Sequence, residues 1–104
     1  MKYELLDLLA CPMDKKYPLE LIVIEEEWKE NRTNDDDLIR WLEIKTGALY
    51  CQTCGRWYPI TDEIPVLLPD ELRKEGDDLK FLQQHRDQLP ERIVGKGKPF
   101  NLSP

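Results

Sequence analysis

The residues most able to do chemistry in this sequence are its three cysteines, Cys11, Cys51 and Cys54. Cys51 and Cys54 are separated by two residues and followed by Gly55, a spacing that lets two thiolates bind one tetrahedral metal ion from a tight turn. A redox pair would place its first cysteine at a helix N-terminus, where the thiol pKa falls. Residues 56–59 read instead as a strand. The pattern therefore favours a metal knuckle, with a redox pair and a metal-free pair as alternatives.

A zinc ribbon needs a second knuckle, and Cys11-Pro12-Met13-Asp14 is the candidate. Its spacing is right, but Asp14 stands where a second cysteine would complete the set. A carboxylate can bind zinc, although thiolate is the softer ligand and suits the ion better. We predict at most one zinc ion per chain, held by Cys11, Cys51 and Cys54, with Asp14 or water as the fourth ligand.

Length and charge narrow the class of protein. The chain has 104 residues, the size of one domain, and 15 Lys and Arg against 21 Asp and Glu give a net charge of −6. An acidic domain is poorly suited to gripping phosphate backbones, so we expect no strong nucleic-acid binding by the chain alone. No apolar run approaches the length of a membrane helix, and no signal peptide is evident. We expect a cytoplasmic protein without a membrane segment.

The apolar patterns predict the elements that must position these ligands. Residues 2–9 read as a short helix and residues 18–24 as a strand; further strands are expected at 48–51, 56–59 and 64–68, and a helix at 77–89. The polar stretch before Leu38 and the apolar side chains that follow it read as a helix. The fold class is therefore α+β: a small antiparallel sheet forming a zinc-ribbon-like domain over residues 1–70, a helical lobe inserted at about 25–46, and a C-terminal helix with an extended tail over 71–104.

The run Ile64-Pro65-Val66-Leu67-Leu68 is the strongest candidate for a docking surface. Pro65 cannot donate to a ladder, so this strand should lie at a sheet edge. Neighbouring side chains alternate between faces, so about half of the five should lie outside the domain's own core. Such an edge suits pairing with a strand of another protein. The alternative is that the run simply fills the domain's own core.

Catalysis has little support in the sequence. There is one histidine, serine occurs only at position 103, and no glycine-rich phosphate loop is present. We therefore expect a non-enzyme.

Three stretches of the sequence together resemble a known family. They are Leu5 to Pro12, Gly47 to Ile60 with its Cys-x-x-Cys, Arg, aromatic and Pro-Ile, and Thr61 to Pro69 with its Ile-Pro and Leu-Leu. The sequence resembles the small zinc-ribbon activator subunits of methyltransferases found in eukaryotes and archaea, with short bacterial relatives. It departs from the family at Asp14, where an intact site has Cys, and at Glu63, where Gly is usual.

The resemblance implies a non-catalytic subunit that forms a heterodimer with class I, S-adenosylmethionine-dependent methyltransferases acting on tRNA, rRNA or a translation release factor. It also implies docking by a strand-to-strand zipper. The family's docking residues correspond here to Leu5, Leu6, Ile64, Pro65, Val66, Leu67 and Leu68. The alternatives are a stand-alone zinc-ribbon nucleic-acid-binding protein and a small redox or metal-transfer protein.

Overall fold

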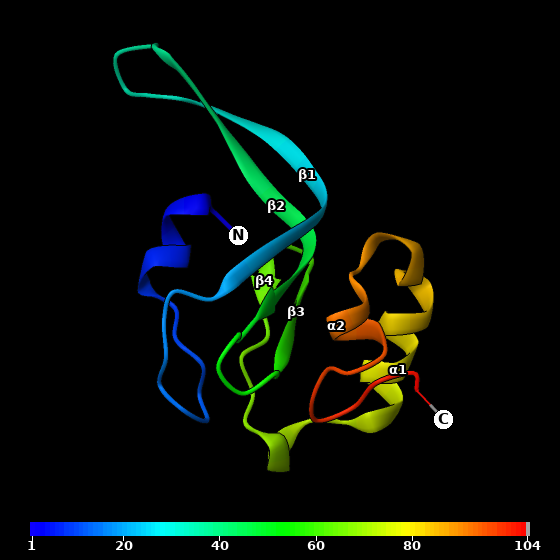
Figure 1. The fold of residues 1–104 in the computed structure, drawn as a ribbon. Coiled ribbons are helices and arrows are strands. Elements are labelled where there is room, and N and C mark those ends of the chain that lie inside the picture. The colour runs from blue at the N-terminus through cyan, green and yellow to red at the C-terminus, as the bar shows by residue number, and fades with distance from the viewer. Residues whose placement is uncertain (104) are drawn as a thin grey trace.

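A computed structural model describes residues 1–103 of the chain (Figure 1). It confirms an α+β fold built on an antiparallel sheet. In chain order the elements are η1 (Tyr3–Leu8), β1 (Glu20–Arg32), β2 (Leu38–Tyr50), β3 (Trp57–Thr61), β4 (Ile64–Pro65), η2 (Asp70–Leu72), α1 (Glu75–Gln84), η3 (Arg86–Gln88) and α2 (Glu91–Val94), where η denotes a 3₁₀ helix. No helix within the described residues is long and apolar enough to cross a membrane.

The four strands follow one another in the sheet in the order β1-β2-β3-β4, and every pair is antiparallel. The two long strands β1 and β2 form a hairpin whose outer half projects from the body as an arm (Figure 1). The projection explains the elongated dimensions of 55 × 28 × 21 Å. The edge strands are β1 and β4, so the expectation that the Ile64-Pro65 segment lies at a sheet edge is confirmed.

The helical lobe predicted at about 25–46 is wrong, because this stretch forms the arm. Leu38, Ile39, Trp41 and Leu42 have helical spacing, yet β-branched and aromatic residues also suit a strand. The aspartates before Leu38 form the hairpin loop instead of a helix N-terminus: Asp36 has φ 62° and the N–H of Thr33 donates to the carbonyl of Asp37 at 2.9 Å. Both faces of the arm meet solvent, so its strands tolerate alternating charge.

The faces of the sheet carry two separate cores. The first core cluster lies on the η1 side and contains Met1, Cys11, Leu19, Ile44, Leu49, Cys51, Tyr58 and Ile60, with Leu6, Leu9, Leu21, Cys54 and Leu67 packed against it. The second core cluster lies on the opposite side, where the C-terminal helices cover Ala48 and Trp57 with Leu82, Leu89, Ile93 and Val94. Strand β3 serves both clusters because its successive side chains alternate between the two faces.

The C-terminal helix expected at 77–89 is confirmed as α1, but it begins earlier, at Glu75, and ends at Gln84, after which the chain continues into η3. The tail then returns to the sheet. The indole Nε1 of Trp57 donates to the carbonyl of Phe100 at 2.9 Å, and the N–H of Trp57 donates to the carbonyl of Lys98 at 3.1 Å. These bonds fix the tail against the start of β3.

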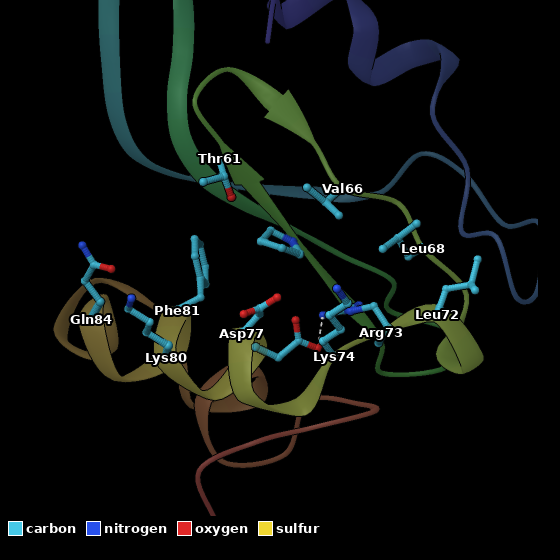
Figure 2. A pocket seen from close by; sticks show the side chains of 12 residues that line it. Thr61, Val66, Leu68, Leu72, Arg73, Lys74, Asp77, Lys80, Phe81 and Gln84 are labelled. Carbon is cyan, nitrogen blue, oxygen red and sulfur yellow. Dashed lines mark ion pairs between the residues drawn. The ribbon is translucent and has the colours of Figure 1, made fainter.

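A groove of about 460 Å³ runs between α1 and the β3–β4 edge (Figure 2). Pro59, Thr61, Val66 and Leu68 line its sheet side. The groove is a consequence of the C-terminal segment, because α1 forms its opposite wall.

Candidate metal centre and docking edge

The two predicted knuckles have the same backbone hydrogen bonding. In the first, the N–H of Cys11 donates to the carbonyl of Lys16 at 2.9 Å, and the N–H of Lys15 donates back to the carbonyl of Cys11 at 2.8 Å. In the second, Cys51 bonds Arg56 and Gly55 in the same way, both at 2.8 Å.

The fifth residue of each knuckle has a positive φ, 65° at Lys15 and 80° at Gly55. The first turn therefore keeps the knuckle conformation although Asp14 replaces a cysteine and Lys15 stands where glycine would be unstrained.

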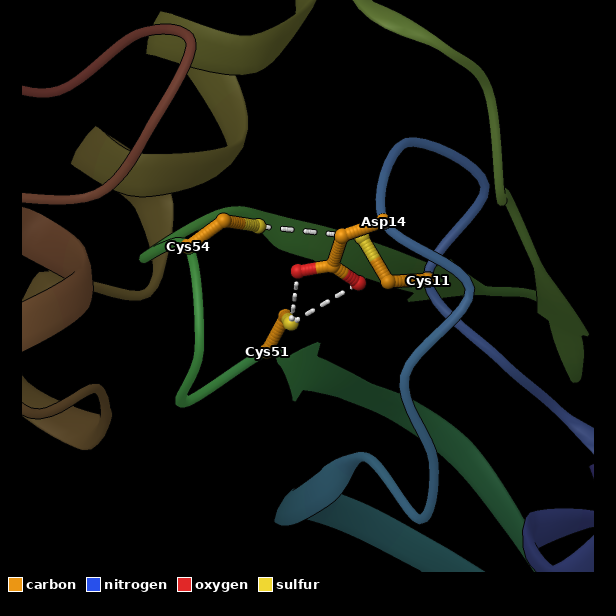
Figure 3. A group of neighbouring side chains, drawn as sticks. All are labelled: Cys11, Asp14, Cys51 and Cys54. Carbon is orange, nitrogen blue, oxygen red and sulfur yellow. Dashed lines mark hydrogen bonds between the residues drawn. The ribbon is translucent and has the colours of Figure 1, made fainter.

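The four side chains meet at one point between the knuckles (Figure 3). One ligand atom from each of Cys11, Asp14, Cys51 and Cys54 lies within 4.8 Å of the others. The sulfurs of Cys11 and Cys54 are 3.7 Å apart, and the sulfur of Cys51 lies 3.3 and 3.6 Å from the two carboxylate oxygens of Asp14.

These separations test the fit of a metal ion. Tetrahedral zinc, with Zn–S of about 2.3 Å and Zn–O of about 2.0 Å, would separate two sulfurs by about 3.8 Å and a sulfur from an oxygen by about 3.5 Å. The observed distances agree with both values, so the three thiols and one carboxylate form a possible metal site. The cysteines are free thiols, and 3.7 Å is far too long for a disulfide bond.

The surroundings of the cluster shift the pKa values of Asp14 and Cys51 in opposite directions. The backbone N–H of Lys16 donates to Asp14 and is the main cause that lowers the pKa of its carboxyl to about 2. Burial raises the pKa of the Cys51 thiol to about 12. That shift is the opposite of the lowered pKa of a reactive redox cysteine, whereas a bound cation would favour the thiolate.

Two supporting residues were not assigned a role from the sequence. The hydroxyl of Tyr58 lies 3.0 Å from the sulfur of Cys11, and burial is the main cause that raises the tyrosine pKa. Arg56 makes a bidentate ion pair with Asp70, at 2.8 and 2.9 Å, beside Cys54. Both residues follow the second knuckle closely in the sequence, and this position could have indicated that they support the cysteines.

The predicted docking residues divide between the two faces of the β4 edge. Leu6 and Leu67 pack against the first core cluster, while Val66 and Leu68 line the groove on the other face. Ile64 is 63% exposed, Leu5 39% and Leu68 37%. Pro65 is half-buried. The alternation expected for five successive apolar residues is therefore observed.

The backbone of this edge is open. The N–H of Val66 donates to the carbonyl of Pro59 at 2.8 Å, which directs it toward β3. The regular strand β4 ends at Pro65, so it is shorter than the strand expected at 64–68, and Leu67 has no pairing partner in β3. Within residues 1–103 no group forms a hydrogen bond with the N–H or C=O of Leu67. The edge thus offers one donor and one acceptor to an incoming strand.

The turn that joins β3 to β4 accommodates the unusual Glu63. Asp62 and Glu63 both adopt positive φ, 49° and 73°, as a two-residue hairpin turn requires. Glu63 forms an ion pair with Lys29 at 2.5 Å, and its N–H donates to the carbonyl of Lys45 at 3.0 Å. The turn is thereby tied to the base of the arm.

Two knuckles facing each other beside a small antiparallel sheet define a zinc-ribbon-like protein. A model of the Trm112p-like protein family matches residues 2–63, which is more than half of the chain. The chain therefore belongs to the Trm112p-like family, and the resemblance noted in the sequence is confirmed.

A solved structure extends this finding. The chain is similar to the Haloferax volcanii Trm112 methyltransferase activator, solved in a complex with a protein assigned as a methyltransferase. The two share 41% identity, the match covers 70% of this chain and all of that chain, and the TM-score is 0.51. A comparison with curated proteins found no match.

Proposed function

We propose that this protein is a non-catalytic subunit that binds, stabilises and activates a class I, S-adenosylmethionine-dependent methyltransferase acting on tRNA, rRNA or a translation release factor. The observation that carries the proposal is the similarity of 70% of this chain to the whole of an activator that was solved together with a protein assigned as a methyltransferase.

The β4 edge supplies a physical means of docking. A strand of the methyltransferase that pairs with residues 64–68 would form hydrogen bonds with the N–H and C=O of Leu67, which have no partner in the described residues. It also covers Ile64, whose side chain is otherwise mostly in water. Pro65 has no N–H, which shortens the ladder that two copies of this edge could form with each other. The edge is therefore better suited to a distinct partner than to self-association.

We also infer that Cys11, Asp14, Cys51 and Cys54 hold one zinc ion with a structural role. The support is the agreement between the observed separations and tetrahedral geometry. An ion in this position ties the N-terminal knuckle to the turn that joins β2 and β3. The bound ion would supply cohesion between the knuckles, as in other ribbons with four protein ligands.

Affinity capture from the native host tests the activator proposal. The tagged chain is purified, and co-eluting proteins are identified by mass spectrometry; we expect a class I methyltransferase. That enzyme is then produced recombinantly with and without this chain, and its soluble yield and methyl transfer are compared. A methyltransferase that is equally soluble and active alone, or the absence of any methyltransferase among the captured proteins, would contradict the proposal.

A further inference from the structure

The groove between α1 and the β3–β4 edge lies largely outside the family match, which ends at residue 63. Its α1 wall and most of its rim come from the C-terminal segment. Apart from Thr61, the sheet side and floor are apolar and consist of Pro59, Val66, Leu68, Leu72 and Phe81. The charges at the rim nearly balance, since Lys74 and Lys80 line it together with Asp77. An apolar side chain fits this lining better than a charged ligand does.

The α1 wall is anchored to the sheet by a buried ion pair. Arg73 and Asp78 are 8% and 5% exposed, and Nη2 and Oδ2 lie 2.8 Å apart, although they are not aligned as a hydrogen bond. Nη1 of Arg73 donates to the carbonyl of Trp57 at 2.6 Å, and its guanidinium lies over the Trp57 ring at 4.9 Å. The ring of Phe81 stacks on Trp57 at 5.7 Å. The groove is therefore preformed and does not need α1 to move.

The groove and the open edge are continuous, because Val66 and Leu68 belong to both. A strand that pairs with Leu67 must place every second side chain on the face that α1 occupies. Those side chains would enter the groove, whose lining residues from the edge and from α1 are drawn in Figure 2.

We propose that α1 is the second wall of the docking site, and that the methyltransferase strand pairing with residues 64–68 inserts an apolar side chain between this edge and α1. The inference rests on the proposed function. A second copy of this chain is a poorer occupant, because each copy carries a net charge of −6 and Pro65 removes an outward donor.

Leu72→Glu tests the groove with little risk to the fold. Leu72 lines the groove and is 57% exposed, and Leu38→Glu at the distant end of the arm is a matched control, with Leu38 50% exposed. Binding is measured to the recombinant methyltransferase identified by capture with the wild-type chain. We expect Leu72→Glu to weaken the Kd by about tenfold or more, because the binding would desolvate the added charge, and Leu38→Glu to change it less than about twofold.

Photocrosslinking identifies the occupant. p-Benzoylphenylalanine is placed at position 84 of the full chain, where exposed Gln84 lines the groove, and separately at position 64 on the edge. We expect both to crosslink to one strand of the methyltransferase.

Crosslinks from position 64 alone, or wild-type affinity of Leu72→Glu, would overturn the inference while leaving the activator proposal intact. Crosslinks from position 84 to a second copy of this chain would also overturn it. Failure of the wild-type chain to bind any methyltransferase would instead contradict the proposed function.

Discussion

Ile64→Ala should separate partner binding from folding. Ile64 is 63% exposed in the free chain, and complete burial of an isoleucine side chain stabilises by about 1.5–3 kcal/mol. If docking buries the exposed share, its removal costs about 1–2 kcal/mol of binding, which is about a 5- to 25-fold increase in Kd. The smaller part of the Ile64 side chain that is already buried in the free chain predicts a loss of only about 0.5–1 kcal/mol in the free energy of unfolding.

Titration calorimetry with the captured methyltransferase, together with urea unfolding of the free chain, measures both quantities. Leu38→Ala is the control, because Leu38 is 50% exposed on the arm, away from β4. It should lose comparable stability and no affinity. Equal affinities of Ile64→Ala and the wild-type chain would refute the reasoning, because Ile64 would then remain in water in the complex.

Three further perturbations test the metal centre and the fold. Elemental analysis of protein purified without chelator should find at most one zinc per chain, and Asp14→Cys should raise zinc retention because thiolate is the softer ligand; no gain would mean that the knuckles do not share an ion. Gly47→Ala should lower the free energy of unfolding by about 1–3 kcal/mol, because the added Cβ would lie 2.5 Å from a backbone carbonyl oxygen of β1. Gly76→Ala should raise the free energy of unfolding by about 0.4–1 kcal/mol, because the added Cβ would meet nothing within 4 Å. Equal melting temperatures of the two variants would contradict this. Asp78→Ala should cost about 3–5 kcal/mol in urea unfolding because it leaves Arg73 buried without its counterion, and the double variant Arg73→Leu/Asp78→Leu should recover part of that loss.

Local patterns explain why the knuckles and the edge strand could be predicted. The spacing of Cys51, Cys54 and Gly55 specifies a turn within five residues, and Pro65 restricts its own strand to a sheet edge. Asp14 was placed by its spacing from Cys11, which the backbone of the first knuckle preserves. That all four ligands converge follows from the pairing of distant segments.

The arm could not be predicted because its sequence suits two structures. Residues 38–42 fit a helical stripe as well as a strand, and the choice between them depends on pairing with β1, which begins well before them in the chain. The groove was equally hidden. The groove exists because Phe81 of α1 stacks on Trp57 of β3, and no local pattern near residue 81 indicates this contact between distant parts of the chain.

Amide hydrogen exchange at Leu67 tests the docking edge most directly. In the free chain the Leu67 N–H has no partner within residues 1–103 and should exchange rapidly, whereas the Val66 N–H, bonded to Pro59 in either state, serves as an internal reference. In the complex with the captured methyltransferase, Leu67 should become protected by at least about tenfold as it pairs with the incoming strand. Unchanged exchange at Leu67 in a fully formed complex would contradict docking through this edge.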